Sequence, residues 1–370
     1  MSEEIKNLQE ELNDQMQIRR DKLAEYEADG IYPFGQRFVV KDHAKDIKND
    51  FLNYEDQPVV IAGRLMTMRS HGKTAFANIR DLSGDIQVYF RKDVLGEDNY
   101  KYVKMLDIGD IVGIEGHVFR THSGEVTIKV DKLTLLSKAL RPLPEKWHGL
   151  KDTELRYRQR YVDLIVNPEV RDTFIKRSKI VAKIREYMMN DGFMEVETPM
   201  MHPIPGGAAA RPFITHHNAL DIDIYMRIAP ELYLKRLIVG GMERVFEMNR
   251  CFRNEGIDNR HNPEFTTIES YQAYGDVEDA IRLTENLVSY CAQEVLGTQE
   301  ITYQGTEINL TPPWNRITMA EGVKKYTGED FDAVTTVEEA RAIADRLNVE
   351  YTNNDGIGKI LNACFEDYVE

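Results

Sequence analysis

Residues 244–274 read RVFEMNRCFRNEGIDNRHNPEFTTIESYQAY, the pattern of two β-strands joined by a loop. The connector at 256–263 has the Gly, Asp/Asn and Pro content of a reversing loop. Successive side chains of a strand point to opposite faces, so every second residue shares a face. The segment therefore predicts a β-hairpin with two chemically distinct faces.

One face of this hairpin collects charged and aromatic side chains. On the first strand the shared face holds Glu247, Asn249, Cys251, Arg253 and Glu255. On the second strand it holds Phe265, Thr267, Glu269 and Tyr271. Taken singly, each residue is explained by a surface ion pair or by ordinary core packing. A strand that only faced a core would be apolar there, however, and the whole set suits a ligand that is part phosphate, part purine and part cation.

The composition is typical of a soluble globular protein, and the length allows more than one domain. The 370 residues are 42% hydrophobic and 29% charged, and this length allows two or more cores. No apolar run approaches membrane-spanning length, and the start MSEEIKNLQEELNDQ lacks the order of a secretory signal. Three scattered cysteines predict neither a disulfide framework nor a zinc site. We expect a cytoplasmic protein.

The formal net charge of −15 argues against a chain that grips nucleic acid over its whole surface. It leaves room for a local basic patch. Two helical segments offer one, and their basic residues are Arg19, Arg20 and Lys22, then Lys176, Arg177, Lys179, Lys183 and Arg185. We interpret both as solvated helix faces.

The first half of the chain predicts a β-barrel behind a helix. Residues 3–29 have apolar positions at helical spacing. From residue 58 to 136 come five short β-rich runs, with a helical piece around 100–106 between the third and fourth. That order is typical of an OB-fold barrel. The predicted domains are a helix and lead-in at 1–57, the barrel at 58–140, a linker at 141–169 and a second domain at 170–370.

The second domain combines helices with the hairpin, which makes the fold class α+β. A helix is predicted at 170–190, a strand at 193–199, a glycine-containing loop at 205–210 and another helix from about 276. Residues 360–369 form an amphipathic pattern that is still in register at Glu370, without a Gly, Asn or Pro stop signal. We therefore expect the sequence to be part of a longer protein.

The hairpin and its surroundings closely resemble class II lysyl-tRNA synthetases of the bacterial type, over almost the whole chain. MRIAPELYLKRLIVGG at 226–241, followed by the hairpin, is similar to the lysine-specific form of the family's second signature motif. The segment ending in Glu197-Thr198-Pro199 is similar to the first motif, whose proline, here Pro199, lies at the dimer interface. The chain contains neither GxxxxGK[ST] nor GxGxxG, so ATP binding would depend on this other architecture.

The resemblance implies an N-terminal five-stranded OB-fold that binds the anticodon, followed by the first part of a class II antiparallel-sheet catalytic domain. It implies a lysine–tRNA ligase that activates L-lysine with ATP and transfers it to the 3′ end of lysine tRNA. Mg²⁺ would assist, and the enzyme would be a cytoplasmic homodimer with no membrane or DNA partner.

Within the hairpin, the resemblance assigns the nucleotide residues. Arg253, as the catalytic residue, would contact the α-phosphate with a planar and permanently charged donor. Phe265 would stack on the adenine. Glu255, His261 and Asn262 would steer the purine or the outer phosphates.

The resemblance also places substrate lysine. Glu231 would hold its α-ammonium, Tyr271 its ε-ammonium, and Glu269 would add negative charge. Gly207 would let the backbone approach the substrate closely. The alternatives are helix capping for Glu231 and an ordinary turn for Gly207.

In the barrel, Arg69, Phe76 and Gln87 match residues with which related synthetases read the central anticodon uridine. Phe76 would stack on the base, Gln87 would bond its edge and Arg69 would contact the base or its phosphate. The alternative is a barrel-core Phe with two surface polar residues.

The chain departs from the family pattern at its end. The third motif is absent, and the glutamates expected to hold Mg²⁺ would lie beyond Glu370, so no metal ligand is assigned. We expect little activation activity from this chain alone. Two alternatives remain: a non-catalytic tRNA-binding paralogue, or a relative that lysylates a protein.

Overall fold

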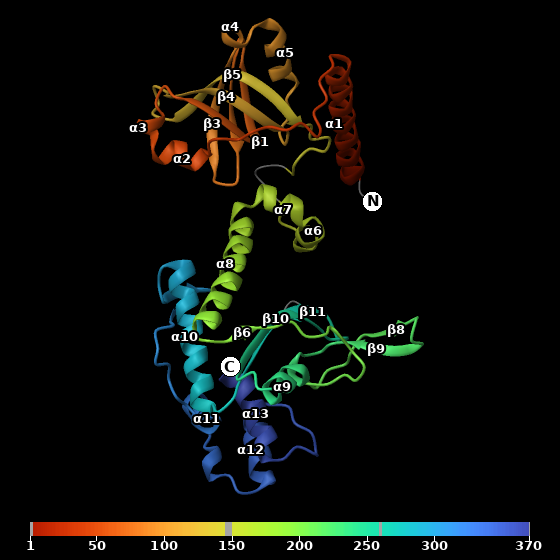
Figure 1. Ribbon diagram of the computed structural model, residues 1–370, viewed down its shortest axis with the longest axis vertical. Helices are drawn as coiled ribbons and strands as arrows, with labels where there is room; N and C mark the ends of the chain where they lie inside the picture. Colours follow the sequence, from red (N-terminus) through yellow and green to blue (C-terminus); the bar gives the residue numbers. More distant parts are fainter. Residues whose placement is uncertain (1–2, 145–149, 259–260, 370) are drawn as a thin grey trace. The chain divides into compact units, whose positions relative to one another are not determined.

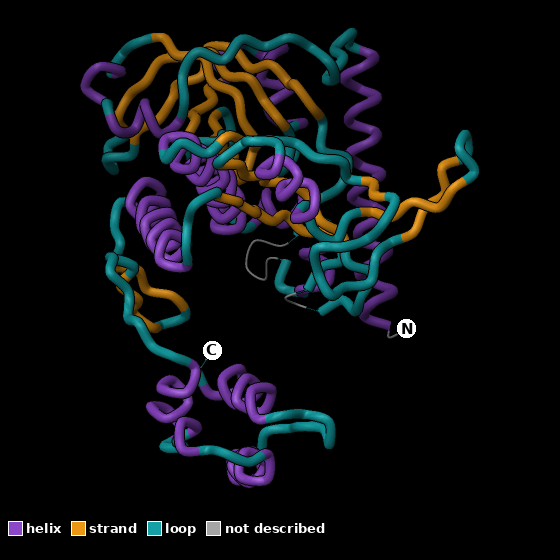
Figure 2. The backbone as a smooth tube through the Cα atoms, turned by 60° about the horizontal axis from the view of Figure 1, so that its bottom comes forward, coloured by secondary structure: helices purple, strands orange, loops and turns teal. Residues whose placement is uncertain are grey.

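A computed structural model describes residues 3–144, 150–258 and 261–369. The chain forms two compact units, Met1–Asp172 and Thr173–Glu370. Figure 1 labels the elements of both units, and Figure 2 shows their secondary structure. None of the described helices is long and apolar enough to cross a membrane.

The first unit contains a closed five-stranded barrel. Its strands are β1 (Pro58–His71), β2 (Thr74–Arg80), β3 (Asp85–Arg91), β4 (Ile111–Arg120) and β5 (Val126–Ser137). They are ordered β1-β2-β3-β5-β4, and the parallel pairing of β3 with β5 closes the barrel. Alternate residues of β2, including Ala75, Ala77 and Ile79, are buried in the barrel core. The predicted OB-fold is confirmed.

The described part of the first unit also contains helices. They are α1 (Glu3–Ala28), α2 (Ala44–Asn49), α3 (Phe51–Tyr54), α4 (Lys92–Leu95), α5 (Glu97–Met105), α6 (Thr153–Arg158) and α7 (Arg160–Val166). The helix predicted between the third and fourth strands is confirmed as α4 and α5. Two helices, α6 and α7, lie within the segment 141–169 that we predicted as a linker.

Of the basic residues of α1 that we interpreted as a solvated face, Arg20 is exposed, whereas Arg19 and Lys22 bind other parts of the unit. Arg19 is only 7% exposed, and its Nη1 donates to the carbonyl oxygens of Ile108, Ala139 and Arg141. Lys22 pairs with Asp107 at 2.7 Å. The interpretation of Arg19 as solvent-facing is therefore wrong: its charge caps backbone carbonyls and fastens α1 to the barrel.

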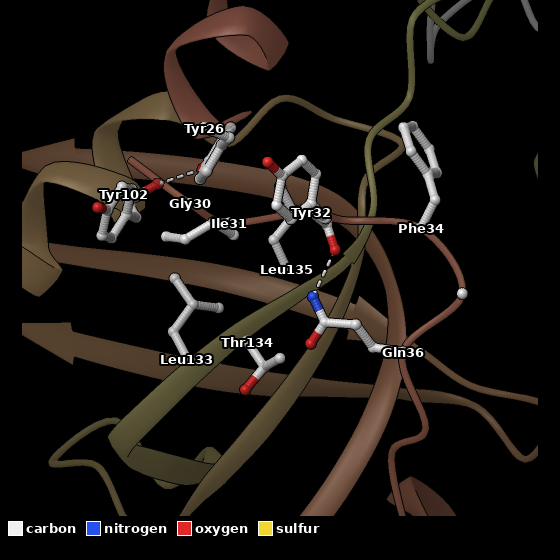
Figure 3. A pocket seen from close by; sticks show the side chains of 11 residues that line it. Tyr26, Gly30, Ile31, Tyr32, Phe34, Gln36, Tyr102, Leu133, Thr134 and Leu135 are labelled. Carbon is white, nitrogen blue, oxygen red and sulfur yellow. Dashed lines mark hydrogen bonds between the residues drawn. The ribbon is translucent and has the colours of Figure 1, made fainter. Parts of the chain in front are cut away.

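A pocket of about 510 Å³ lies where the chain leaves α1 and passes the barrel strand β5. Figure 3 shows its aromatic lining, with the Tyr26 hydroxyl donating to the carbonyl oxygen of Tyr102 and the Gln36 amide donating to that of Tyr32. The Tyr32 side chain is largely exposed at its rim.

The second unit is built around a three-stranded sheet of order β11-β10-β6. Its strands are β6 (Met194–Glu195), β10 (Arg244–Phe252) and β11 (Glu264–Gln272). The strand predicted at 193–199 is thus much shorter than expected, and it pairs in parallel with β10. The predicted hairpin is confirmed as β10 and β11, which pair over their whole length.

Two helices cover one face of this sheet. They are α8 (Pro168–Asn190), which begins in the first unit, and α10 (Val277–Leu296) (Figure 1). A buried cluster joins Met188 of α8 and Phe193 to Phe246 of β10, with Ile268 of β11 and Leu287 of α10 against it. Because these sheet residues have even numbers, the face that carries Glu247 and Glu269 is the opposite one.

The remaining elements of the second unit lie outside this sheet. A second three-stranded sheet holds β7 (Met201–His202), β8 (Ile214–His217) and β9 (Ile222–Met226), and its β8–β9 hairpin projects from the unit (Figures 1 and 2). The other elements are α9 (Glu231–Val239), β12 (Glu300–Tyr303), β13 (Thr306–Asn309), α11 (Met319–Thr327), the 3₁₀ helix η1 (Phe331–Ala333), α12 (Val337–Leu347) and α13 (Ile357–Tyr368). The last predicted helix is confirmed as α13, whose Ile360 and Cys364 are buried.

Candidate nucleotide and amino-acid site

The register of the hairpin brings the predicted residues to one face. Across β10 and β11, Glu247 lies opposite Glu269, Asn249 opposite Thr267 and Cys251 opposite Phe265. Directly opposed residues of an antiparallel pair share a face. The predicted face of the hairpin is therefore confirmed.

Arg253 and Phe265 lie side by side at the end of this face. The guanidinium carbon of Arg253 is 5.2 Å from the centroid of the Phe265 ring. The backbone NH of Arg253 donates to the carbonyl oxygen of Pro263 at 2.8 Å. This bond joins the two strands at the base of the hairpin loop and holds the Arg253 backbone in place. Among the described residues, no acceptor reaches the buried Nε of Arg253. A buried donor left without an acceptor is costly, and a bound anion would supply one.

The loop residues are spread more widely. The Glu255 carboxylate accepts from the backbone NH of Arg211 at 3.3 Å, and the Asn254 NH donates to the Arg211 carbonyl at 2.7 Å. His261 and Asn262 are exposed, and the His261 ring lies 2.7 Å from the Asp258 carboxylate. The structure thus ties Glu255 to the 205–211 loop, while His261 is turned toward Asp258.

The residues assigned to lysine gather where α9 packs on β11. The Tyr271 hydroxyl donates to the Glu269 carboxylate at 3.3 Å. Glu231, the first residue of α9, lies next to Gly207: a Cβ at Gly207 would sit 3.0 Å from the Glu231 Cβ. Gly207 also has a φ of +92°, a conformation that favours glycine. The Gly207 backbone therefore packs closely against Glu231, and its approach to the substrate stays a prediction.

Burial and neighbouring charges shift the pKa values of two residues assigned to lysine. Burial raises the pKa of Glu269, and the charge of Glu231 raises it further. Burial also raises the pKa of Tyr271, with Glu269 and Glu231 adding to the effect. Two carboxylates and a phenol thus share one half-buried space in which a positive group would be stabilised.

A buried ion pair that the sequence pattern did not reveal supports this face. Arg227 Nη1 lies 2.6 Å from Glu247 Oε1, and both side chains are fully buried. Arg227 Nε donates to the carbonyl oxygen of Arg250 at 2.8 Å, and the Thr198 hydroxyl donates to Glu247 Oε2 at 2.6 Å. Burial of charged residues depends on tertiary packing, so periodicity gave no signal for Arg227.

In the barrel, Arg69, Phe76 and Gln87 line one cleft of about 410 Å³. Arg69 lies opposite Phe76 in the β1–β2 register, and the Phe76 ring stacks on Tyr89 at 4.3 Å. The Gln87 amide oxygen accepts from the Thr127 hydroxyl at 2.8 Å. Phe76 lies on the strand face opposite the core residues Ala75 and Ala77, so the barrel-core interpretation is wrong.

Two further assignments, Pro199 at a dimer interface and the absence of a metal ligand, stay predictions. Pro199 is exposed, and its carbonyl oxygen lies 2.8 Å from His202 Nε2. Exposed Met194 and Met201 lie near it in the chain. For metals, the described part of the chain contains no group of three or more His, Cys, Asp or Glu side chains that could hold an ion.

Comparison with known proteins identifies the class. Residues 152–356 match the family model described as tRNA synthetases class II (D, K and N), and residues 59–136 match the OB-fold nucleic acid binding domain. The chain is therefore a class II aminoacyl-tRNA synthetase chain, with an OB-fold ahead of the catalytic fold.

Its relatives define the family within that class. The chain is 56% identical to the lysine–tRNA ligase of Thermoanaerobacter pseudethanolicus, over 100% of this chain and 74% of that protein. It is 57% identical to the one from Carboxydothermus hydrogenoformans, over 98% and 74% respectively. It is 54% identical to the one from Bacillus subtilis, over 100% and 75%. The chain belongs to the lysine–tRNA ligase family.

Proposed function

We propose that this protein activates L-lysine with ATP and transfers it to the 3′ end of lysine tRNA. The observation that carries the proposal is the Arg253 guanidinium, which lies against Phe265 with its buried Nε lacking an acceptor among the described residues. A planar cation beside an aromatic ring matches a nucleotide, which carries a phosphate and a base.

In the first step, a lysine carboxylate oxygen forms a bond to the α-phosphorus of ATP. The bond from that phosphorus to the bridging oxygen of the β-phosphate breaks, and pyrophosphate leaves. Arg253 donates to the α-phosphate oxygens, where negative charge accumulates, and Phe265 holds the adenine. Glu255, His261 and Asn262 contact the purine or the outer phosphates.

Lysine is held at its two ammonium groups. Glu231 accepts from the α-ammonium, and Tyr271 accepts from the ε-ammonium, with Glu269 adding charge. Gly207 lets the backbone approach Glu231 and the substrate. In the second step, the 3′-hydroxyl oxygen of the tRNA bonds to the lysyl carbonyl carbon, the hydroxyl proton is released and AMP leaves.

The first unit would recognise the tRNA. We propose residues 58–140 as the anticodon-binding domain, with Phe76 stacking on the central base and Arg69 and Gln87 contacting it. The exposed segment around Pro199 would lie at the interface of a homodimer, and the enzyme would act in the cytoplasm, without DNA or membrane partners.

Mg²⁺ would neutralise ATP phosphate charge when bound. The described residues offer no matching carboxylate group, so none of the steps above is assigned to the metal. These 370 residues also contain no segment that resembles the third motif, whose arginine would cover the adenine.

Ligand binding tests the proposal. Equilibrium dialysis with labelled L-lysine should show binding that L-arginine and L-aspartate displace poorly, and ATP should bind in parallel. Failure of lysine to bind, or equal binding of all three amino acids, contradicts the proposed substrate.

A further inference from the structure

An internal lysine lies beside the residues proposed to receive the substrate's ammonium groups. The Nζ atom of Lys235 is 2.5 Å from Glu231 Oε1 and 5.9 Å from the centroid of the Tyr271 ring. Lys235 lies one turn after Glu231 on α9, so the contact forms within one helix and reaches across to β11.

The surrounding charges explain why an ammonium is stabilised there. Glu231 is 29% exposed at its side chain, and its charge acts on Glu269 and on Tyr271. Two partly buried carboxylates repel each other unless a cation is near. Lys235 supplies that cation. Its ammonium is carried on a flexible four-carbon chain, and the side chain is 56% exposed. It can therefore leave Glu231 and return to water at small cost.

We propose that the Lys235 ammonium is a tethered competitor for the substrate's α-ammonium at Glu231. Lysine binding requires Lys235 to release Glu231, which raises the dissociation constant for lysine. A ligand without an α-ammonium leaves the Lys235–Glu231 pair in place and binds independently of it. This inference rests on the proposed function, because it needs Glu231 to be part of the lysine site.

A matched pair of variants tests the inference. Lys235→Met removes the competing charge and keeps an unbranched side chain. Arg236→Met removes one positive charge from the neighbouring position, whose guanidinium lies over the Tyr233 ring at 4.8 Å. Lys235→Arg keeps a cation one turn from Glu231. Both positions are exposed, so folding should be preserved in all three variants.

The readout is calorimetric affinity for L-lysine and for 6-aminohexanoic acid, which keeps the carboxylate and the ε-ammonium and lacks the α-ammonium. Lys235→Met should bind L-lysine about two- to fivefold more tightly, the scale of a helical ion pair that is partly shielded from water. Its affinity for 6-aminohexanoic acid should not change. Arg236→Met and Lys235→Arg should bind both ligands as the wild type does.

The following results would overturn the inference. Unchanged or weaker lysine binding by Lys235→Met would show that the ammonium does not compete. An equal gain for 6-aminohexanoic acid, or an equal gain in Arg236→Met, would indicate a general effect of charge. If neither the wild type nor Lys235→Met binds lysine, both the proposed function and this inference are wrong. If the wild type binds lysine and Lys235→Met binds it no more tightly, only this inference is wrong.

Discussion

The Arg253 guanidinium carbon lies 5.2 Å from the centroid of the Phe265 ring, and the backbone NH of Arg253 is bonded to Pro263 across the hairpin. A guanidinium over an aromatic face is attracted by the ring electrons. The contact and the backbone bond together hold the cation in place, so little side-chain freedom is lost when an anion binds.

Arg253→Met should weaken ATP binding by about tenfold or more, because a charge-assisted hydrogen bond to phosphate is lost. Arg250 provides the control. It is on the opposite face of the same strand, 3.1 Å from Glu264, and Arg250→Met should leave ATP affinity unchanged. Titration with a fluorescent ATP analogue measures both variants, and equal losses in the two would remove Arg253 from the nucleotide site.

The affinity for lysine should depend on pH through Glu269. Its pKa is raised above the ordinary 4.5, chiefly by burial. The Glu269 carboxyl group therefore binds a proton more tightly in the folded protein than in the unfolded chain. As pH rises from 4.5 through the raised pKa, ionisation of Glu269 lowers the stability of the folded state. Lysine binding changes in the other direction, because only the ionised carboxylate attracts an ammonium.

We therefore expect lysine affinity to fall as pH is lowered, starting above pH 4.5. Glu269→Gln should bind lysine more weakly at neutral pH and show a smaller pH dependence. Glu264→Gln, at an exposed position on the opposite face of β11, should keep the wild-type profile. Calorimetric titrations from neutral to acidic pH measure this, and a profile unaltered by Glu269→Gln would exclude Glu269 as the titrating group.

Local pattern was sufficient for much of this fold. Alternation along 244–274 predicted that Cys251 and Phe265 share a face, because strand geometry alone dictates it. Helical spacing likewise predicted α1 and α13. These predictions needed no knowledge of distant contacts.

Other features depended on contacts between segments far apart in the chain. Arg19 is buried because three carbonyl oxygens from other segments surround its guanidinium. Arg227 is buried because Glu247, 20 residues later, lies 2.6 Å away. From sequence alone, an arginine is expected to be exposed to solvent. Only the tertiary packing shows that Arg19 and Arg227 are buried.

Phe76→Ala should weaken binding of lysine tRNA, because Phe76 lines the barrel cleft with one face of its ring resting on Tyr89. Stacking of one base on an aromatic side chain contributes about 1–3 kcal/mol. Phe76→Leu, which keeps bulk without a ring, should lose most of the same affinity. Tyr32→Ala is the control, since Tyr32 is an exposed aromatic at another pocket of the same unit. An electrophoretic shift that Phe76→Ala and Tyr32→Ala alter equally would remove the cleft from tRNA recognition.

Arg227→Met should be the most destabilising of these substitutions. It leaves the Glu247 carboxylate buried with the Thr198 hydroxyl, and without the guanidinium 2.6 Å away that balances its charge. Breaking a buried ion pair by removing one partner costs about 3–5 kcal/mol. Arg227→Met/Glu247→Met removes both charges, and it should recover much of that loss because a buried pair and an apolar pair of similar volume differ little in stability.

Urea unfolding followed by circular dichroism measures the unfolding midpoints. Exposed Arg236→Met is the control, and its stability is expected within about 0.5 kcal/mol of wild type. A double variant no more stable than Arg227→Met would mean that the bonds from Arg227 to the backbone, such as the 2.8 Å contact with the Arg250 carbonyl, hold this face together and the ion pair does not.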